Sequence, residues 1–100
     1  MRHHTTRKDI EAQLLELNRL LGRPERPWVI GKVHGNAANV GNIHLYRDHL
    51  GYKIYEMVNT GGGVRDVTYK DLPTRRAVSL WLDGAIYSSQ RLNEKNAPQA

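Results

Sequence analysis

Apolar residues near the start of the chain recur at helical spacing. The positions i, i+4, i+7 and i+11 are occupied by Ile10, Leu14, Leu17 and Leu21, which places them on one stripe of a helix. Thr6 precedes the stripe, and Asp9 lies three residues after Thr6, which is the spacing of a capping box. Gly22 comes directly after the stripe, as is typical of a helix end. The pattern predicts a helix that begins after Thr6 and stops at Gly22.

The middle of the chain has the composition of strands separated by short loops. Segments 28–33, 40–46, 52–58 and 64–69 are rich in strand-forming residues. Segment 34–39 has the composition of a turn, and 47–51 and 59–63 are further loops. Because parallel strands need long crossovers, these short connections predict antiparallel pairing.

Alternation assigns the side chains of these strands to two faces. In the second and third strands, the face that we expect to be buried is formed by Ile43, Leu45, Tyr52, Ile54 and Val58. The opposite face is expected to carry His44, Tyr46, Lys53, Tyr55 and Met57. A face with tyrosine, histidine and lysine is a candidate surface for binding or self-association.

A second helix is predicted to open near Pro73, because proline is favoured at the first helical position. Its apolar stripe is formed by Val78, Trp81, Leu82 and Ala85. Trp28 and Trp81 are interpreted as core residues. From residue 93 onward the chain is polar, and we expect it to fray.

The order of elements predicts an α+β fold: an antiparallel sheet of three or four strands, with an N-terminal and a C-terminal helix packed on one face. A chain of 100 residues is the size of one domain. We expect an ordered core at about residues 6–90, with polar tails at 1–5 and 93–100.

Composition narrows the class of partner. Fifteen Lys and Arg residues against ten Asp and Glu give a net charge of +5, which attracts polyanions but also simply favours solubility. The chain has no cysteine, which excludes disulfides and thiolate zinc sites and indicates a reducing, cytoplasmic setting. No apolar run approaches the roughly 20 residues of a membrane helix, and we expect no membrane association.

Two clusters are candidates for binding an anion. In the first, Gly61, Gly62 and Gly63 could direct backbone N–H groups at a ligand; the alternative is an ordinary hairpin loop. In the second, Arg75 and Arg76 open the second helix and could form one basic edge with Arg65 and Lys70, since arginine binds phosphate in a bidentate manner. The alternative is a solvated helix end.

Tyr55, His44 and Lys53 complete the candidate binding residues. An exposed tyrosine on a sheet can stack a base or anchor a protein interface. The five histidines show no metal-ligand spacing, and the acidic residues are scattered. We therefore expect no metal, no cofactor and no enzymatic activity.

Several segments carry a resemblance to a known group of proteins. Residues 39–45, 51–59 and 61–64, followed by Pro73-Thr74-Arg75-Arg76, are similar to short uncharacterised accessory proteins of tailed bacteriophages and prophages. The resemblance implies a small protein that binds host factors, inhibits defence nucleases or sequesters nucleotide signals, and it assigns no functional residue. The element order also resembles double-stranded-RNA-binding domains, but these have a lysine-rich start to the second helix, where this chain has only Arg75 and Arg76.

Together these observations predict a small non-enzymatic, phage-type accessory protein that binds an anionic partner, either nucleic acid or a phosphorylated nucleotide. The alternative is a protein–protein inhibitor of a host or bacterial defence complex, as anti-CRISPR proteins are. In either case we expect a homo-oligomer.

Overall fold

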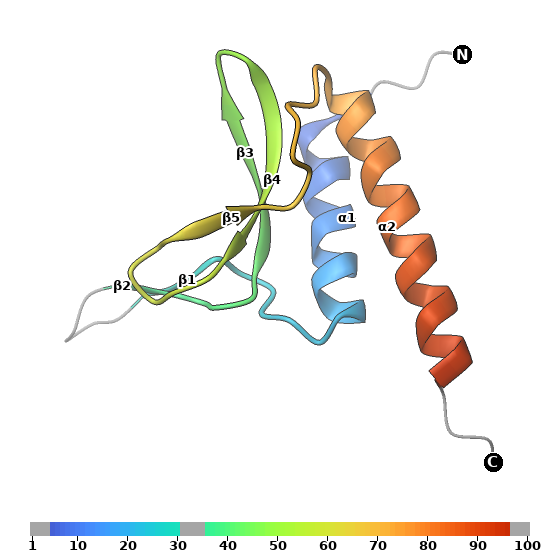
Figure 1. The fold of residues 1–100 in the computed structure, drawn as a ribbon, viewed down its shortest axis with the longest axis horizontal. Coiled ribbons are helices and arrows are strands. Elements are labelled where there is room, and N and C mark those ends of the chain that lie inside the picture. The colour runs from blue at the N-terminus through green and yellow to red at the C-terminus, as the bar shows by residue number, and fades with distance from the viewer. Residues whose placement is uncertain (1–4, 31–35, 97–100) are drawn as a thin grey trace.

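The computed structural model describes residues 5–30 and 36–96 of the chain. The fold is α+β, as predicted, with two helices beside a three-stranded antiparallel sheet and a second, two-stranded sheet (Figure 1). In chain order the elements are α1 (Arg7–Leu20), β1 (Trp28–Ile30), β2 (Asn36–Ala38), β3 (Ile43–Asp48), β4 (Gly51–Met57), β5 (Val64–Asp66) and α2 (Arg75–Asn96).

The predicted capping box starts α1. The Thr6 hydroxyl accepts a hydrogen bond from the Asp9 N–H at 3.2 Å, and the Asp9 carboxylate accepts one from the Thr6 N–H at 2.8 Å. After the helix, Gly22 takes a φ of +67°, a conformation that suits glycine. Leu21 follows the last helical residue and is 40% exposed, so the buried stripe ends at Leu17.

The main sheet has the order β3-β4-β5, and all its strands are antiparallel. Strands β3 and β4 form a tight hairpin in which Asp48 pairs with Gly51 across the turn residues His49 and Leu50. The Asp48 carboxylate accepts a hydrogen bond from the Leu50 N–H at 2.8 Å, which fixes the turn. The last predicted strand is shorter than expected: β5 ends at Asp66.

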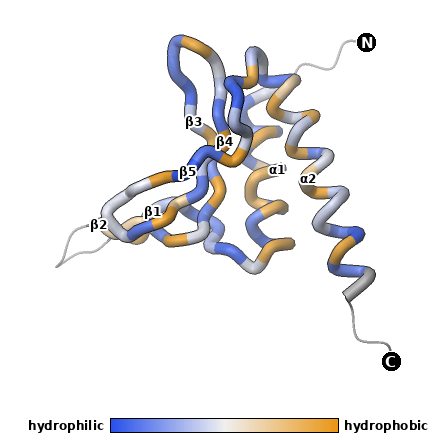
Figure 2. The backbone as a smooth tube through the Cα atoms, viewed as in Figure 1, coloured by the Kyte–Doolittle hydropathy of each residue, from blue (hydrophilic) through white to orange (hydrophobic). Residues whose placement is uncertain are grey.

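The core lies between the two helices and the main sheet. Its buried members are Ile10, Leu14, Leu17, Ile43, Ile54, Val78, Leu82 and Ile86. Figure 2 shows hydrophobic positions recurring along both helices, as the sequence pattern predicted. Trp81 packs against this cluster, in agreement with its predicted role.

Several predictions near the small sheet are wrong. Segment 34–39 was predicted as a turn, but Asn36–Ala38 forms β2 because it pairs with β1; residues 31–33 of the predicted first strand lie outside the described residues. Trp28 is 43% exposed and is not a core residue. Its ring lies against Gly62, where an added Cβ would be 2.7 Å from the indole.

At the C-terminal end of β4, the burial of the side chains also differs from the prediction. Val58 is 45% exposed and lies beyond the strand, whereas Met57, expected on the open face, is 2% exposed. The Met57 N–H donates to the Asn42 carbonyl, and the Met57 carbonyl accepts from the Gly41 N–H. The chain before β3 therefore lies against this end of the strand, which alternation alone does not reveal.

Helix α2 begins later and ends later than predicted. The Thr74 hydroxyl accepts a hydrogen bond from the Ala77 N–H at 3.1 Å, so Thr74 caps the helix and Pro73 precedes the cap. The helix continues to Asn96, through the segment predicted to fray. The Asn93 amide donates to the Leu20 carbonyl at 3.1 Å, which holds this end of α2 against the end of α1.

Candidate anion-binding groove

A groove of about 1140 Å³ lies between the tip of the β3–β4 hairpin and the start of α2. Hairpin residues 47–52 form one wall, and residues 73–76 with Ser79 and Leu80 form the other. Thr5, just before α1, closes one side. Three distant segments of the chain therefore meet here.

Three arginines contribute side chains to this groove. Arg75 and Arg76 come from the first turn of α2, and Arg47 comes from the end of β3. Within residues 5–30 and 36–96, no side-chain hydrogen bond or ion pair involves any of the three guanidinium groups. Arg47 instead lies over the Tyr52 ring, 5.5 Å from its centroid. The groove therefore concentrates positive charge that no ion pair among the described residues offsets.

Most other described arginines do have acidic partners. Ion pairs join Arg7 to Glu11, Arg19 to Glu25, Arg23 and Arg65 to Glu56, and Arg91 to Glu94. Apart from the three groove residues, Arg26 is the one described arginine without such a partner. The unpaired arginines are thus concentrated at the groove.

The start of α2 adds to the positive character. The first turn of α2 contains no acidic residue, whereas the first turn of α1 contains Asp9. Because a helix N-terminus carries a partial positive charge, Arg75 and Arg76 work against the stability of their own helix. The single carboxylate among the lining residues, Asp48, already accepts the Leu50 N–H.

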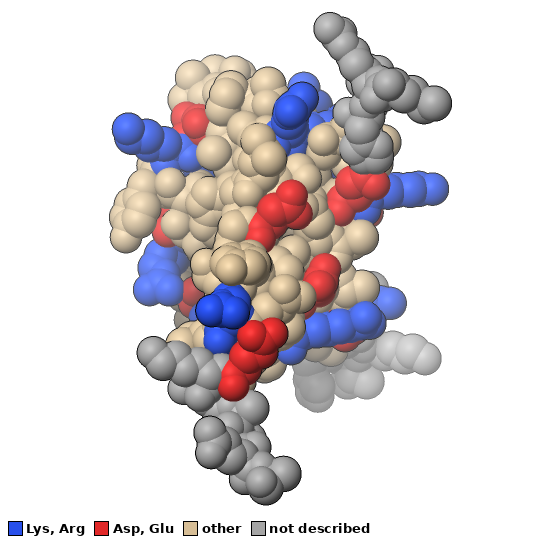
Figure 3. Space-filling model, turned by 90° about the vertical axis from the view of Figure 1, so that its right-hand side faces the viewer, with Lys and Arg blue, Asp and Glu red and all other residues tan. Residues whose placement is uncertain are grey.

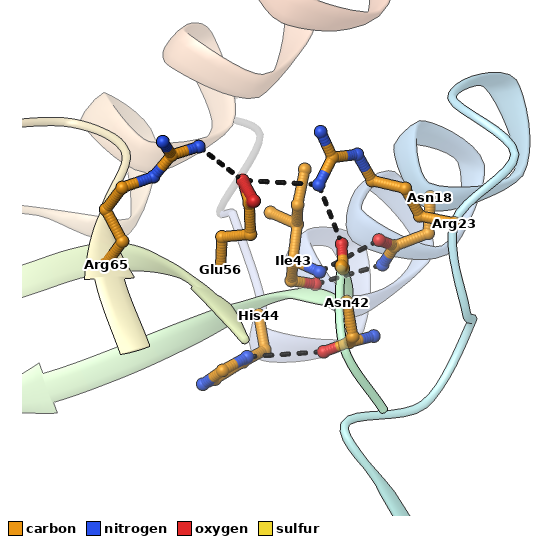
Figure 4. Close-up of polar contacts among 8 residues, drawn as sticks. Asn18, Arg23, Asn42, Ile43, His44, Glu56 and Arg65 are labelled. Carbon is orange, nitrogen blue, oxygen red and sulfur yellow. Dashed lines mark hydrogen bonds and ion pairs between the residues drawn. The ribbon is translucent and has the colours of Figure 1, made fainter. Parts of the chain in front are cut away.

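Arg65 does not join Arg75 and Arg76, and the predicted basic edge is not formed. Arg65 lies on β5 directly across from Glu56, and the two side chains pair at 2.8 Å. Figure 4 shows Glu56 held between Arg65 and Arg23. Burial acts to raise the pKa of the Glu56 carboxyl, but hydrogen bonds from Arg65 and Arg23 outweigh it and lower that pKa below its usual value. Lys70 is exposed and lies outside the groove walls.

The glycine loop uses its N–H groups internally. The Asn59 side-chain oxygen accepts from the Gly61 N–H at 3.0 Å and from the Gly63 N–H at 2.9 Å. The Gly62 N–H donates to the Asn59 carbonyl. With these donors occupied, the geometry supports the alternative interpretation of Gly61–63 as a hairpin loop.

The open face of the sheet carries aromatic side chains and carboxylates. Tyr46 and Tyr55 stack at 4.9 Å between centroids, and His44 meets Tyr55 edge-on at 6.2 Å. Lys53 lies 3.9 Å from the Asp66 carboxylate and 3.7 Å from that of Asp71.

These surroundings change the charge of the face. Asp66 and Asp71 raise the pKa of the Lys53 ammonium and offset its charge. Burial raises the pKa of the Tyr55 phenol and lowers that of the His44 imidazole. The face therefore does not extend the positive charge of the groove.

Arg47 and His49 are groove residues that the sequence reasoning missed. His49 is one of the two turn residues at the hairpin tip, and Arg47 lies on β3 two residues before it. Their one sequence signal is a pair of basic residues around Asp48 in a predicted loop. That signal does not indicate which helix end the loop packs against.

Comparison with known proteins adds no assignment: no protein-family model, curated protein or solved structure matches the chain. Among the described residues, no group of three or more His, Cys, Asp or Glu side chains could hold a metal ion. No helix in residues 5–30 and 36–96 has the length and apolar character needed to cross a membrane.

Proposed function

We propose that this protein binds an anionic partner, a phosphorylated nucleotide or a nucleic acid, in the groove between the β3–β4 hairpin and α2. The observation that supports the proposal is the meeting of Arg47, Arg75 and Arg76, none of them paired among the described residues, at a helix start without acidic residues. A bound phosphate would accept hydrogen bonds from the guanidinium forks and from the helix N-terminus.

The size and chemistry of the groove suit a ligand larger than one phosphate. Small-molecule sites usually measure about 300–1,000 Å³, and this groove, at about 1140 Å³, could hold a nucleotide or a few linked nucleotides. Tyr52 supplies apolar surface beside the arginines. Figure 3, which views the side of α2, shows acidic and basic side chains interspersed. A local site therefore fits better on this side than a long basic track.

The proposed activity is binding, in the cytoplasm of a host cell, by an accessory protein of the phage type. No catalytic step, metal or cofactor forms part of the proposal. Asp48, the one carboxylate among the lining residues, accepts a hydrogen bond from the Leu50 N–H and holds the hairpin turn.

The test uses two double variants with the same loss of charge. Arg75→Gln with Arg76→Gln removes two groove cations, and Arg26→Gln with Arg91→Gln removes two cations elsewhere. Binding is measured by calorimetry with ATP and by fluorescence anisotropy with a labelled single-stranded oligonucleotide.

The groove variant should bind roughly a hundredfold more weakly, because each charge-assisted hydrogen bond contributes about 1.5–3 kcal/mol. The control variant should bind nearly as well as the parent. Equal losses in the two variants would mean that the attraction is only net charge, and no binding by the parent would remove the proposal.

A second candidate function, inhibition of a host or bacterial defence complex, is favoured by the exposed apolar surface. Tyr69 is 89% exposed, Tyr87 63% and Leu92 57%; tyrosine is frequent at protein interfaces. Replacing Tyr69 and Tyr87 with Ser should release a stoichiometric partner captured from host lysate, while the groove variant should retain it. The opposite pattern would favour the anion groove.

We also propose that the chain forms a homo-oligomer. The aromatic sheet face is compatible with self-association, and the edge of the sheet offers a specific way to achieve it.

A further inference from the structure

Strand β3 forms an outer edge of the main sheet. In an antiparallel hairpin, alternate residues direct their N–H and C=O groups toward the neighbouring strand. The pair Asp48 and Gly51 closes the turn, and the pairs Tyr46 with Lys53 and His44 with Tyr55 follow at intervals of two residues. These alternate residues direct their backbone groups toward the neighbouring strand of the hairpin. The backbone groups of the intervening residues, Ile43, Leu45 and Arg47, therefore point away from β4.

One of these three residues already has a partner. The Asn18 side chain of α1 donates to the Ile43 carbonyl at 2.9 Å and accepts from the Ile43 N–H at 2.9 Å (Figure 4). A neighbouring strand would make the same two bonds. For Leu45 and Arg47, no described residue supplies the equivalent bonds. The open part of the edge is therefore restricted to these two residues.

A second, smaller groove runs beside this edge. It measures about 500 Å³ and lies between α1 and residues 42–45, with Leu14, Leu15 and Pro27 among the residues that line it. Charged residues, among them Glu11 and Arg26, also line it. In strand addition, an exposed sheet edge supplies main-chain hydrogen bonds and neighbouring pockets receive alternate side chains. The groove also leaves room beside Ile43, where an added strand must pass the end of α1.

We propose that a second copy of this chain occupies the edge, so that two β3 strands pair antiparallel about a two-fold axis. Three registers would place backbone groups that point away from β4 opposite one another and near the open groups of Leu45 and Arg47. If Leu45 paired with Leu45 of the second copy, Arg47 of that copy would lie opposite Ile43. The backbone groups of Ile43 are already bonded to Asn18, so Arg47 would gain no partner. Pairing Arg47 with Arg47 of the second copy would place like charges directly opposite, which is destabilising. Pairing Leu45 with Arg47 of the second copy, and the reverse, satisfies the free groups of both residues in both copies.

This register also matches the side chains on the open face. Tyr46 comes opposite Tyr46 of the second copy, which extends the Tyr46–Tyr55 stack across the interface. His44 comes opposite Asp48 of the second copy. The Nδ1 atom of His44 contacts the Asn42 side-chain oxygen at 3.2 Å, so Nε2 is the ring nitrogen available to that carboxylate.

The same pairing provides a place for an exposed apolar side chain. Leu50, at the hairpin tip, is 63% exposed. In the proposed register the turn of the second copy comes beside Asn42 and Ile43, at the mouth of the α1–β3 groove. Because the interface is two-fold symmetric, each copy places its Leu50 against the groove of the other.

This inference specifies the surface of the proposed homo-oligomer and does not depend on anion binding. The test exploits the absence of cysteine from the chain. Tyr46→Cys introduces a single thiol whose Cα would lie about 4.5 Å from that of its copy. His44→Cys is the matched control on the same strand and face, since residue 44 and its copy would be about 13 Å apart.

Each variant is oxidised with glutathione disulfide, and covalent dimer is followed by mass spectrometry. Tyr46→Cys should cross-link at least about tenfold faster than His44→Cys. In parallel, the cysteine-free protein and Leu50→Glu are compared by sedimentation equilibrium, with Leu92→Glu as a control of similar exposure. Leu50→Glu should raise the dissociation constant of the dimer about a hundredfold, and Leu92→Glu should leave it unchanged.

The possible outcomes separate the two levels of the proposal. A strictly monomeric parent protein would overturn both self-association and the edge assignment. A dimer that Leu50→Glu leaves intact, or that cross-links equally through residues 44 and 46, would overturn the edge assignment and leave self-association standing. Either result is independent of whether ATP or an oligonucleotide binds.

Discussion

Replacing Asn18 with Ala should destabilise the protein far more than a typical polar substitution. Asn18 is 1% exposed, and its amide makes both bonds to the Ile43 backbone at 2.9 Å. Each lost hydrogen bond contributes about 1 kcal/mol, and a buried N–H or C=O left without a partner costs about 1–3 kcal/mol. We therefore expect the free energy of unfolding to fall by about 3 kcal/mol, a large share of the roughly 5–15 kcal/mol typical of a domain.

Urea denaturation followed by far-ultraviolet circular dichroism measures this loss. For a slope of about 1–1.5 kcal/mol per molar urea, the midpoint should move down by about 2–3 M. Asn93→Ala is the matched control, because its amide makes one exposed bond, to the Leu20 carbonyl, and should cost under about 1 kcal/mol. If the two variants lost the same small amount, Asn18 would not be acting as the partner of the β3 edge, and the reasoning about that edge would fail with it.

Three further substitutions test other parts of the structure. Glu56→Gln should destabilise the protein at neutral pH, and because the folded pKa of Glu56 is lowered, the difference from the parent in urea midpoint should shrink as pH falls through that pKa; a difference independent of pH would contradict the paired geometry. Gly84→Ala should increase the free energy of unfolding by about 1 kcal/mol and so raise the thermal midpoint, because alanine favours the helix and the added Cβ meets nothing within 4 Å. Gly62→Ala should lower it, because φ is +96° and the Cβ would meet the Trp28 ring at 2.7 Å; equal effects of the two alanines on calorimetric melting would count against the loop geometry.

The elements that could be predicted from the sequence are those set by local contacts. The capping box of Thr6 and Asp9 and the apolar stripe of α1 depend on residues within one or two turns. The capping box appears as predicted, and so does the stripe as far as Leu17, but not Leu21. The β3–β4 hairpin was predicted from alternation and a loop at 47–51, but the turn consists of only two residues because Arg47, Asp48 and Gly51 pair within the strands. By contrast, β2 exists because it pairs with β1, and the end of α2 is held by a bond to α1. Neither contact is visible from nearby residues.

The candidate site shows the same division. Arg75 and Arg76 were recognised as two adjacent arginines, suited to bidentate phosphate binding, at a predicted helix start, whereas Arg47 joins them through the packing of the hairpin tip against α2. Arg65 was misplaced because strand alternation does not reveal its cross-strand partner, Glu56. Charge patterns thus identified candidates, and the three-dimensional pairing of opposite charges decided which of them stayed unpaired.

The measurement that tests the central proposal most directly is a titration of the isotopically labelled protein with inorganic pyrophosphate, followed by amide chemical shifts. The account predicts concentration-dependent shifts at the backbone amides of residues 47–52 and 74–76, which line the groove. The amides of Gly61 and Gly63, already bonded to Asn59, should remain in place. Shifts concentrated in the glycine loop, with the groove amides unmoved, would contradict the assignment of the anion site.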